Sequence, residues 1–221
     1  MTASPITEQL QELYCKLYDA FGPQGWWPGE TPFEVALGAI LTQNTNWGNV
    51  SKVITGLKDE GILDPVALAT MPEAELANRF RSAGYYNIKA RRVKNFLDFF
   101  AGRFDNSMEK MAAEDWEPLR EALLKLHGIG PETADSILLY ALHKPTFVVD
   151  AYTFRVLSRH HLVTDPCSYE ELRQFFMDRL PPEVPLYQEF HALLVRVGKD
   201  FCRPQPRCSG CPLENWSGVR V

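Results

Sequence analysis

The sequence has 221 residues, of which 45% are hydrophobic and 23% are charged, a composition typical of a globular chain with one large or two small hydrophobic cores. No apolar run approaches the length of a membrane-spanning helix, and residues 1–5 lack the basic and apolar regions of a secretory signal, so we expect a cytoplasmic protein. The formal net charge of −5 argues against the broad basic surface that nucleic-acid-binding proteins usually carry. A local basic face is still compatible with the run from Lys89 to Lys94.

The N-terminal part of the chain predicts two helices joined by a tryptophan loop. Residues 7–21 form an amphipathic pattern, in which Cys15 is expected to be a small buried residue. The loop residues Trp26, Trp27 and Pro28 lie outside any helical periodicity. Either one indole anchors this loop in the core, or the two indoles form a stacking platform for a planar ligand. Thr31 then provides the cap of the next helix.

The second apolar helix runs into a polar segment from Thr42 to Trp47, rich in amides and hydroxyls. Asn46 is expected to cap the helix that follows it. Farther along, the segment Gly84–Ala90 precedes another helix with an apolar core face. Every element up to this point is predicted to be helical.

The stretch from Trp116 to His160 predicts a helix, a tight hairpin, a second helix, a short extended strand and a third helix. Helical apolar spacing on both sides is interrupted by Gly128 and Gly130, and Pro131 restarts it. The two glycines allow a sharp turn and leave backbone N–H groups bare at the start of the second helix. Such a helix start suits an anion such as a phosphate.

Asp150 follows the apolar run Phe147–Val149 and precedes a helical pattern. A carboxylate at this position caps the helix and tends to stay ionised. Taken alone, Asp150 is adequately explained as a cap, and the glycine hairpin as an interhelical turn. Their occurrence together, at this separation, favours a functional interpretation.

Together these motifs resemble the helix-hairpin-helix DNA glycosylases of the endonuclease III superfamily, over nearly the whole chain. The resemblance implies an all-α fold of two lobes, with residues 31–139 as the bundle carrying the hairpin and residues 1–30 plus 140–221 as the terminal lobe. The base pocket would lie between these lobes. It also implies that Gly128 and Gly130 grip a DNA phosphate and that Asp150 lies at the flipped nucleotide. Gln43 would fill the gap left by the flipped base, and Tyr85 would wedge into the opposite strand.

The residue after Pro131 indicates which reaction the resemblance implies. Bifunctional members of the family carry a lysine two residues after the second hairpin glycine, whereas this chain has Glu132. A carboxylate cannot form the Schiff base of the lyase reaction. We therefore expect a monofunctional glycosylase, in which Asp150 stabilises the oxocarbenium-like sugar and positions water.

The tryptophan loop indicates the class of base. The residues Trp26, Trp27, Pro28 and Trp47 look like the aromatics and proline that line the base pocket of the endonuclease III-type 3-methyladenine glycosylases. A cationic alkylated purine favours the electron-rich faces of indoles. Two alternatives stay open: a glycosylase for oxidised or mismatched bases on the same scaffold, and a non-catalytic binder that keeps only the hairpin.

Three cysteines near the C-terminus indicate metal rather than disulfides in a cytoplasmic chain. The resemblance implies a 4Fe-4S cluster on Cys202, Cys208 and Cys211, but Ser217 stands where the fourth cysteine would fall. The cluster could take a non-cysteine ligand or Cys167, the loop could be a remnant, or the three thiolates could bind zinc. As partner, the resemblance implies double-stranded DNA with a damaged base, bound by a monomer without any membrane.

Overall fold

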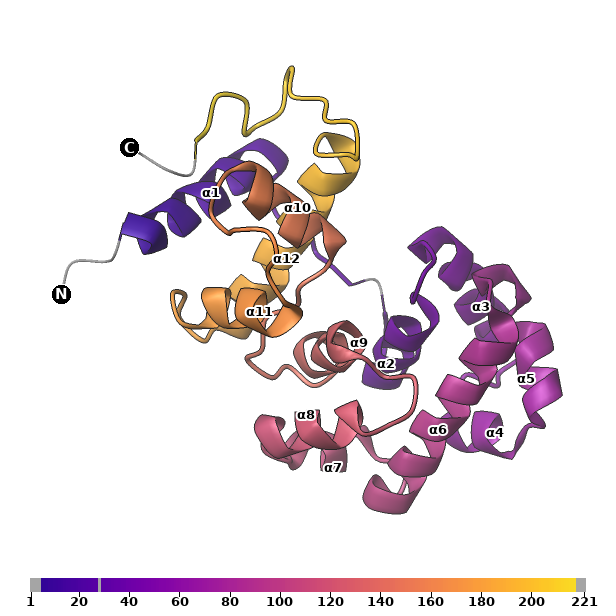
Figure 1. Cartoon of the computed structure of the whole chain (residues 1–221). Helices are drawn as coiled ribbons and strands as arrows, with labels where there is room; N and C mark the ends of the chain where they lie inside the picture. Colours follow the sequence, from indigo (N-terminus) through magenta and orange to yellow (C-terminus); the bar gives the residue numbers. More distant parts are fainter. Residues whose placement is uncertain (1–4, 28, 218–221) are drawn as a thin grey trace. The chain divides into compact units, whose positions relative to one another are not determined.

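The computed structural model describes residues 5–27 and 29–217, and every element assigned in these ranges is a helix (Figure 1). The prediction of an all-α fold is therefore confirmed. None of these helices has the combination of length and apolar character needed to cross a lipid bilayer.

The helices follow one another with short connections. In chain order they are α1 (Pro5–Phe21), α2 (Pro32–Leu41), α3 (Trp47–Asp59), α4 (Pro65–Thr70), α5 (Glu73–Arg79), the 3-10 turn η1 (Arg81–Ala83), α6 (Tyr86–Phe104), α7 (Met108–Ala113), α8 (Trp116–Leu124), α9 (Pro131–Ser136), the π-helical η2 (Ile137–Ala141), α10 (Ala151–Arg159), α11 (Tyr169–Met177) and α12 (Val184–Asp200). The predicted caps Thr31, Asn46 and Asp150 each accept a hydrogen bond from the backbone of their helix.

Backbone contacts divide the chain into two compact units, residues 27–144 and residues 1–26 with 145–221. The boundaries expected from the sequence were 31–139 and 1–30 with 140–221. The chain therefore begins in one unit, builds the other as a continuous segment, and returns to the first. Each unit has its own buried residues and is described by itself below.

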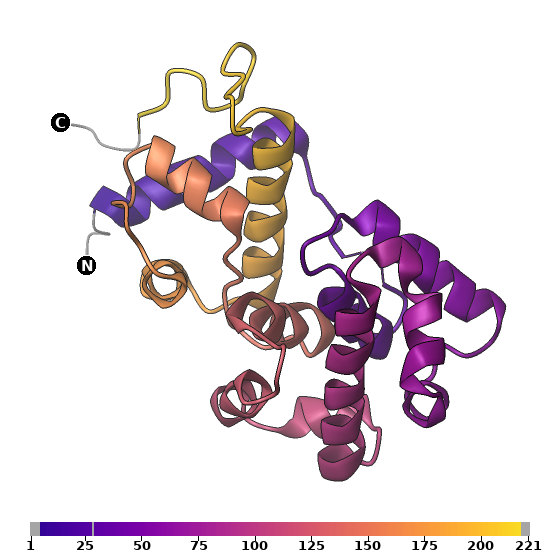
Figure 2. The ribbon, with the colours of Figure 1, turned by 45° about the vertical axis from the view of Figure 1, so that its right-hand side comes forward.

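The unit of residues 27–144 is built around α2, η2 and α6. Residues 33–41 of α2 are all buried, and so are residues 133–141 of α9 and η2. Apart from Glu34, which pairs with Lys58, the buried residues of α2 are apolar, and η2 is apolar throughout except for the Tyr140 hydroxyl. Such helices require burial on most sides, which explains why α2 and η2 pack against each other in the interior. In Figure 2 the long helix α6 lies beside α5.

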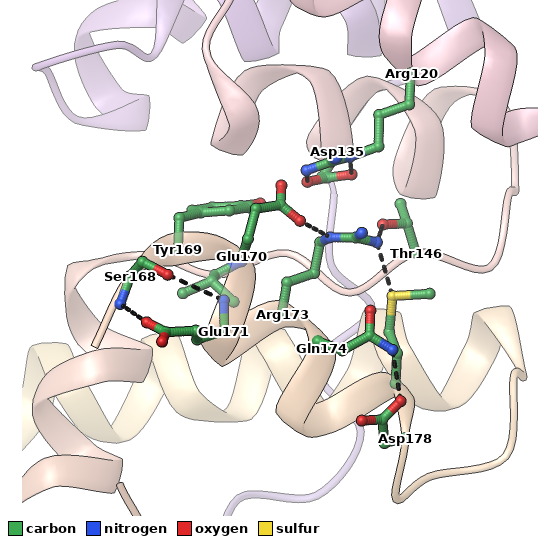
Figure 3. A network of polar contacts seen from close by, with 12 residues as sticks. Arg120, Asp135, Thr146, Ser168, Tyr169, Glu170, Glu171, Arg173, Gln174 and Asp178 are labelled. Carbon is green, nitrogen blue, oxygen red and sulfur yellow. Dashed lines mark hydrogen bonds and ion pairs between the residues drawn. The ribbon is translucent and has the colours of Figure 1, made fainter. Parts of the chain in front are cut away.

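The hairpin helices α8 and α9 are tied together by a buried ion pair (Figure 3). Arg120 of α8 donates from Nε and Nη2 to the two carboxylate oxygens of Asp135 in α9, at 2.8 and 2.9 Å. The Asp135 side chain is fully buried, so this bidentate geometry compensates the cost of burying its charge. The pair thus joins the helix before the hairpin to the helix after it.

The unit formed by both chain ends packs α1 and α10 against α12 (Figure 2). Helix α1 contributes Leu10, Leu13 and Leu17, each fully buried. In α11, Ser168 and Glu171 form a capping box, and Arg173 binds Glu170 and Thr146 (Figure 3).

One predicted element is not formed. Residues 147–149 were expected to be a short strand, but they are buried chain without regular secondary structure and have no strand partner among the described residues. The apolar side chains of this run are buried in the core. Phe147, for instance, stacks on Phe176 of α11 with ring centroids 3.9 Å apart.

Candidate active site

Asp150 is held in one orientation by the helix that it caps. Its Oδ1 accepts hydrogen bonds from the backbone N–H of Thr153 at 2.8 Å and from the Thr153 hydroxyl at 2.9 Å. Its Oδ2 lies 3.7 Å from Nε2 of His191 on α12, and the carboxylate side chain is 12% exposed. One carboxylate oxygen is thus fixed by α10, and the other faces the imidazole of His191.

The surroundings of Asp150 favour its ionised form. Burial alone would raise the pKa of this carboxyl group, but His191 and the two hydrogen bonds from Thr153 outweigh burial and lower the pKa below its usual value of 3.8. A carboxylate that is nearly buried yet ionised is suited to stabilising positive charge on a neighbouring atom.

The two hairpin glycines have different roles in the backbone. Gly128 has φ +95°, and a Cβ there would lie 2.3 Å from Cγ of Arg92, so a side chain is excluded by both conformation and space. At Gly130, whose φ is −90°, a Cβ would meet open space. Within the protein, therefore, only Gly128 must be glycine. The lack of a side chain at Gly130 would matter only for a ligand that approaches the backbone from solvent.

Gln43 lies against the hairpin and is hydrogen-bonded through its whole amide group. Its Nε2 donates to the Gly128 carbonyl at 3.0 Å and to the Thr133 hydroxyl at 2.8 Å, while its Oε1 accepts from Nη1 of Arg92. Of the residues selected from the sequence, Gln43 and Gly128 are thus in direct contact.

Tyr85 projects from a tight turn ahead of α6. It is 66% exposed, and both Gly84 and Tyr85 have positive φ, at 69° and 47°. The turn is held from within by Lys89, whose buried Nζ donates to the Ala83 carbonyl at 2.6 Å. Burial, with a smaller effect from the charge of Arg92, lowers the pKa of Lys89 to about 8. The exposed ring is therefore presented by a fixed backbone.

Trp27 and Trp47 form one aromatic cluster, with Tyr140 of η2 as its third member. Trp27 meets Trp47 edge-on with ring centroids 5.8 Å apart, and its centroid lies 5.0 Å from that of Tyr140. Both indoles pack on Gly38 of α2, where a Cβ would lie 3.1 Å from Trp47 and 3.5 Å from Nε1 of Trp27. Both are half-buried, so each is partly a core residue and partly accessible.

Trp26 has different neighbours from Trp27, although the two are adjacent in sequence. The Trp26 ring carries the ammonium group of Lys199 at 5.0 Å from its centroid, and the same ammonium lies 6.0 Å from the Tyr152 centroid. One face of Trp26 is thus already occupied by a cation. Pro28, also expected in the base pocket, lies outside the described residues.

The C-terminal cysteine loop is held by arginine contacts. Arg159 donates to the carbonyls of Arg203 and Pro204 at 2.6 and 2.8 Å and to Sγ of Cys202 at 3.3 Å. His160 is hydrogen-bonded through Nδ1 to the carbonyl of buried Trp216. These contacts hold the loop at both ends.

The residues of this loop do not fit a four-cysteine cluster. Cys202 is buried, whereas Cys208 is exposed, and Ser217 takes the place of the fourth thiol. In residues 5–27 and 29–217, no three His, Cys, Asp or Glu side chains are arranged so that they could hold a metal ion. Cys15 is exposed in α1, so its expected burial was wrong.

With this geometry established, comparison with known proteins gives the family. Residues 37–182 match the family described as the HhH-GPD superfamily base excision DNA repair proteins. The match spans the hairpin, Gln43, Tyr85 and Asp150. The chain belongs to this family.

Two relatives and two solved structures bring out the similarity. The chain is 44% identical over 211 residues to a candidate DNA repair glycosylase of Methanocaldococcus jannaschii, covering 95% of this chain and 96% of that one. It is 29% identical to endonuclease III of Thermotoga maritima, covering 83% and 81%.

Among solved structures, the 3-methyladenine DNA glycosylase MagIII of H. pylori bound to 1,N6-ethenoadenine matches with TM-score 0.74 and 31% identity, covering 90% of this chain and 98% of that one. A non-covalent endonuclease III–DNA complex matches with TM-score 0.81, covering 99% and 97%; at 23% identity it supports the fold alone.

The sequence did not indicate two residues that contact the predicted site residues, His191 beside Asp150 and Arg92 beside Gln43. His191 lies in an ordinary helical pattern of α12, and Arg92 is one of several basic residues of α6. Neither residue type nor spacing distinguishes them, because their partners lie 41 and 49 positions away.

Proposed function

We propose that this protein is a monofunctional DNA glycosylase that acts as a monomer on double-stranded DNA. It hydrolyses the N-glycosidic bond of a flipped damaged base, and the preferred base is an alkylated purine such as 3-methyladenine. The observation that carries the proposal is Asp150, an ionised and nearly buried carboxylate within a base-excision repair family.

The mechanism follows from the environment of Asp150. As the bond to the base breaks, positive charge develops on the sugar, and the fixed negative charge of the carboxylate stabilises it. Thr153 holds Oδ1, so Oδ2 is the atom available to the sugar or to the attacking water. The proton released by water goes to Oδ2 or to solvent. Because a cationic base is already a good leaving group, little further catalysis is needed.

The absence of a lysine after the hairpin supports monofunctional chemistry. Glu132 occupies that position and is exposed on the first turn of α9. A carboxylate offers no amine for a Schiff base with the sugar. The expected product is therefore an abasic site in an intact strand.

Preference for an alkylated purine is supported by two observations. Trp27 and Trp47 are accessible indoles held in one cluster, and stacking of a cationic ring on an indole is worth about 0.5–2 kcal/mol. The 31% identical MagIII structure is that of a 3-methyladenine glycosylase. We further propose that the cysteine loop keeps its shape through Arg159, as a remnant without a cluster.

The test is a base-release assay on a panel of duplexes carrying alkylated, oxidised or mismatched bases. We expect release of the alkylated purine, no strand cleavage before alkali, and no covalent complex after borohydride. Release of oxidised bases with strand cleavage would support an endonuclease III-like activity instead, and binding without any release would support a non-catalytic binder.

Asp150→Asn tests the role of the carboxylate charge without removing the helix cap, because asparagine also caps helices and should leave α10 intact. We expect base release to fall at least about tenfold, since one such electrostatic contact is worth about 2.7–4 kcal/mol in the transition state. Binding to undamaged duplex should change little. Full activity in this variant would refute the role assigned to Asp150.

A further inference from the structure

The amide group of Gln43 has no spare N–H donor in the free protein. An amide nitrogen carries two N–H groups, and those of Gln43 are directed to the Gly128 carbonyl and the Thr133 hydroxyl. Its oxygen accepts from Arg92. Gln43 therefore cannot use its side chain elsewhere without giving up a bond to the hairpin or to α6.

Arg92 has far more donors than partners. A guanidinium group has five N–H donors, and in the described part of the chain the acceptor for Arg92 is the neutral oxygen of Gln43, with no carboxylate in ion-pair contact. Lys89 adds a second positive charge one turn earlier on α6, and the two cations influence each other. The protein thus leaves the charge of Arg92 uncompensated.

Arg92 also lies directly on the hairpin. Its Cγ, Nε and Cδ pass within 2.3–2.9 Å of the position that a Cβ of Gly128 would take. One turn farther along α6, Asn95 donates to the His127 carbonyl at 2.9 Å. This face of α6 lines the hairpin, so a phosphate close to the hairpin backbone would be within reach of the Arg92 guanidinium.

We propose that Arg92 is a positioning residue with two alternative partners: it holds Gln43 against the hairpin in the free protein, and it binds a DNA phosphate in the complex, which releases the oxygen of Gln43. The proposal rests on the function proposed above, because it takes DNA as the ligand. A half-buried guanidinium without a carboxylate is well suited to bidentate phosphate contact. Binding of the DNA backbone by Arg92 and release of the Gln43 oxygen would then occur together.

This arrangement predicts competition between Gln43 and DNA for Arg92. If Arg92 exchanges partners in this way, DNA binding to the wild-type protein breaks the Arg92–Gln43 hydrogen bond. In Gln43→Ala no such bond is lost, so Arg92 contributes more to DNA binding. The loss of affinity caused by Arg92→Met should therefore be about fivefold larger in the Gln43→Ala background, the factor that one net hydrogen bond represents.

The experiment is a double-mutant cycle on undamaged duplex, where no gap exists for Gln43 to fill. Dissociation constants are measured for wild type, Arg92→Met, Gln43→Ala and the double variant at several salt concentrations. Methionine keeps the aliphatic chain that crosses Gly128; if it lowers the melting temperature, Arg92→Gln replaces it. We also expect Arg92→Met to reduce the slope of log K against log salt by about 0.9, as for the loss of one phosphate contact.

Arg91→Met is the control for charge. Arg91 is adjacent, 69% exposed and paired with Glu73 at 3.7 Å, so its effect should be additive with that of Gln43→Ala. An Arg92 penalty that is equal or smaller in the Gln43→Ala background would overturn the proposal, because Arg92 would then stay with Gln43 on DNA. Since the cycle measures binding alone, absence of base release would refute the proposed activity and leave this result standing.

Discussion

The chemistry of Asp150 depends on one local partner and one distant partner in the chain. Its helix cap is local, since Thr153 lies three positions away, whereas His191 comes from α12. Both lower the pKa of the carboxyl group against the opposing effect of burial. A group with a lowered pKa stabilises the fold above its unfolded pKa, and this contribution is lost as pH falls through the folded value.

The first prediction at this scale concerns pH. In the wild-type enzyme, the midpoint of any loss of base release caused by protonation of Asp150 should lie below pH 3.8, the usual pKa of this group. His191→Leu removes a group that lowers the pKa while burial persists, so the acidic limb of the rate profile should move to higher pH. His191→Gln, which keeps an N–H donor, should move it less. Single-turnover release measured across pH, with folding checked at each point, is the test; identical profiles would exclude His191 from this role.

The residues that sequence alone could identify are those with local partners. Asn46 and Asp150 were predicted as caps because a cap bonds to its own helix. The contacts of Gln43 with Arg92 and the hairpin could not be predicted, because the side chains meet only after three segments have packed. Family resemblance indicated that Gln43 matters, but not what holds it.

At the scale of elements, α2 and α3 carry a matched pair of glycines. Gly38 in α2 and Gly56 in α3 both accept, through their carbonyls, the hydrogen bond from the C-cap N–H of their helix. A Cβ at Gly56 would meet nothing within 4 Å, whereas one at Gly38 would press on the two indoles. The position in the helix is the same and only the surroundings differ.

We therefore expect Gly56→Ala to raise the free energy of unfolding by about 0.5–1 kcal/mol, the usual gain in a helix interior. Gly38→Ala should gain less or lose stability, because Trp47 must move by a few tenths of an ångström. If Trp27 and Trp47 contact the base, Gly38→Ala should also change the rate of base release, and Gly56→Ala should not. Denaturant unfolding and base release on both variants decide this; equal effects would mean that the indoles adapt freely.

Most of the helices were predictable, and the exceptions are informative. Apolar periodicity and caps gave α2, α3 and α6 because these helices are amphipathic or capped by their own residues. The prediction of a strand at residues 147–149 was wrong. A short apolar run does not show whether a partner strand exists, and strand formation depends on that context. The π-helical turn η2, which carries Tyr140, had no sequence signal, since it arises from packing within a continuous helical pattern.

At the scale of the whole molecule, neither unit has a net positive charge that would attract DNA. Residues 27–144 contain 13 Lys and Arg against 16 Asp and Glu, and the rest of the chain contains 10 against 12. Attraction to phosphates would therefore depend on local groups, and the proposal above assigns one such contact to Arg92, which has no carboxylate partner among the described residues. This explains why a charge of −5 is compatible with membership of a DNA repair family.

The division of the chain into two units predicts that a core mutation in one unit destabilises mainly that unit. Leu13 of α1 and Leu68 of α4 are both fully buried leucines, one in each unit. Replacing either by alanine should cost about 2–5 kcal/mol. If the units unfold separately, Leu13→Ala should accelerate hydrogen exchange in α1 and α10–α12, where Leu13 helps to close the core formed by the two chain ends. Leu68→Ala should accelerate it in α3–α6 instead. Exchange followed by mass spectrometry resolves these peptides, and equal acceleration in both sets by either variant would show that the chain unfolds as one cooperative unit.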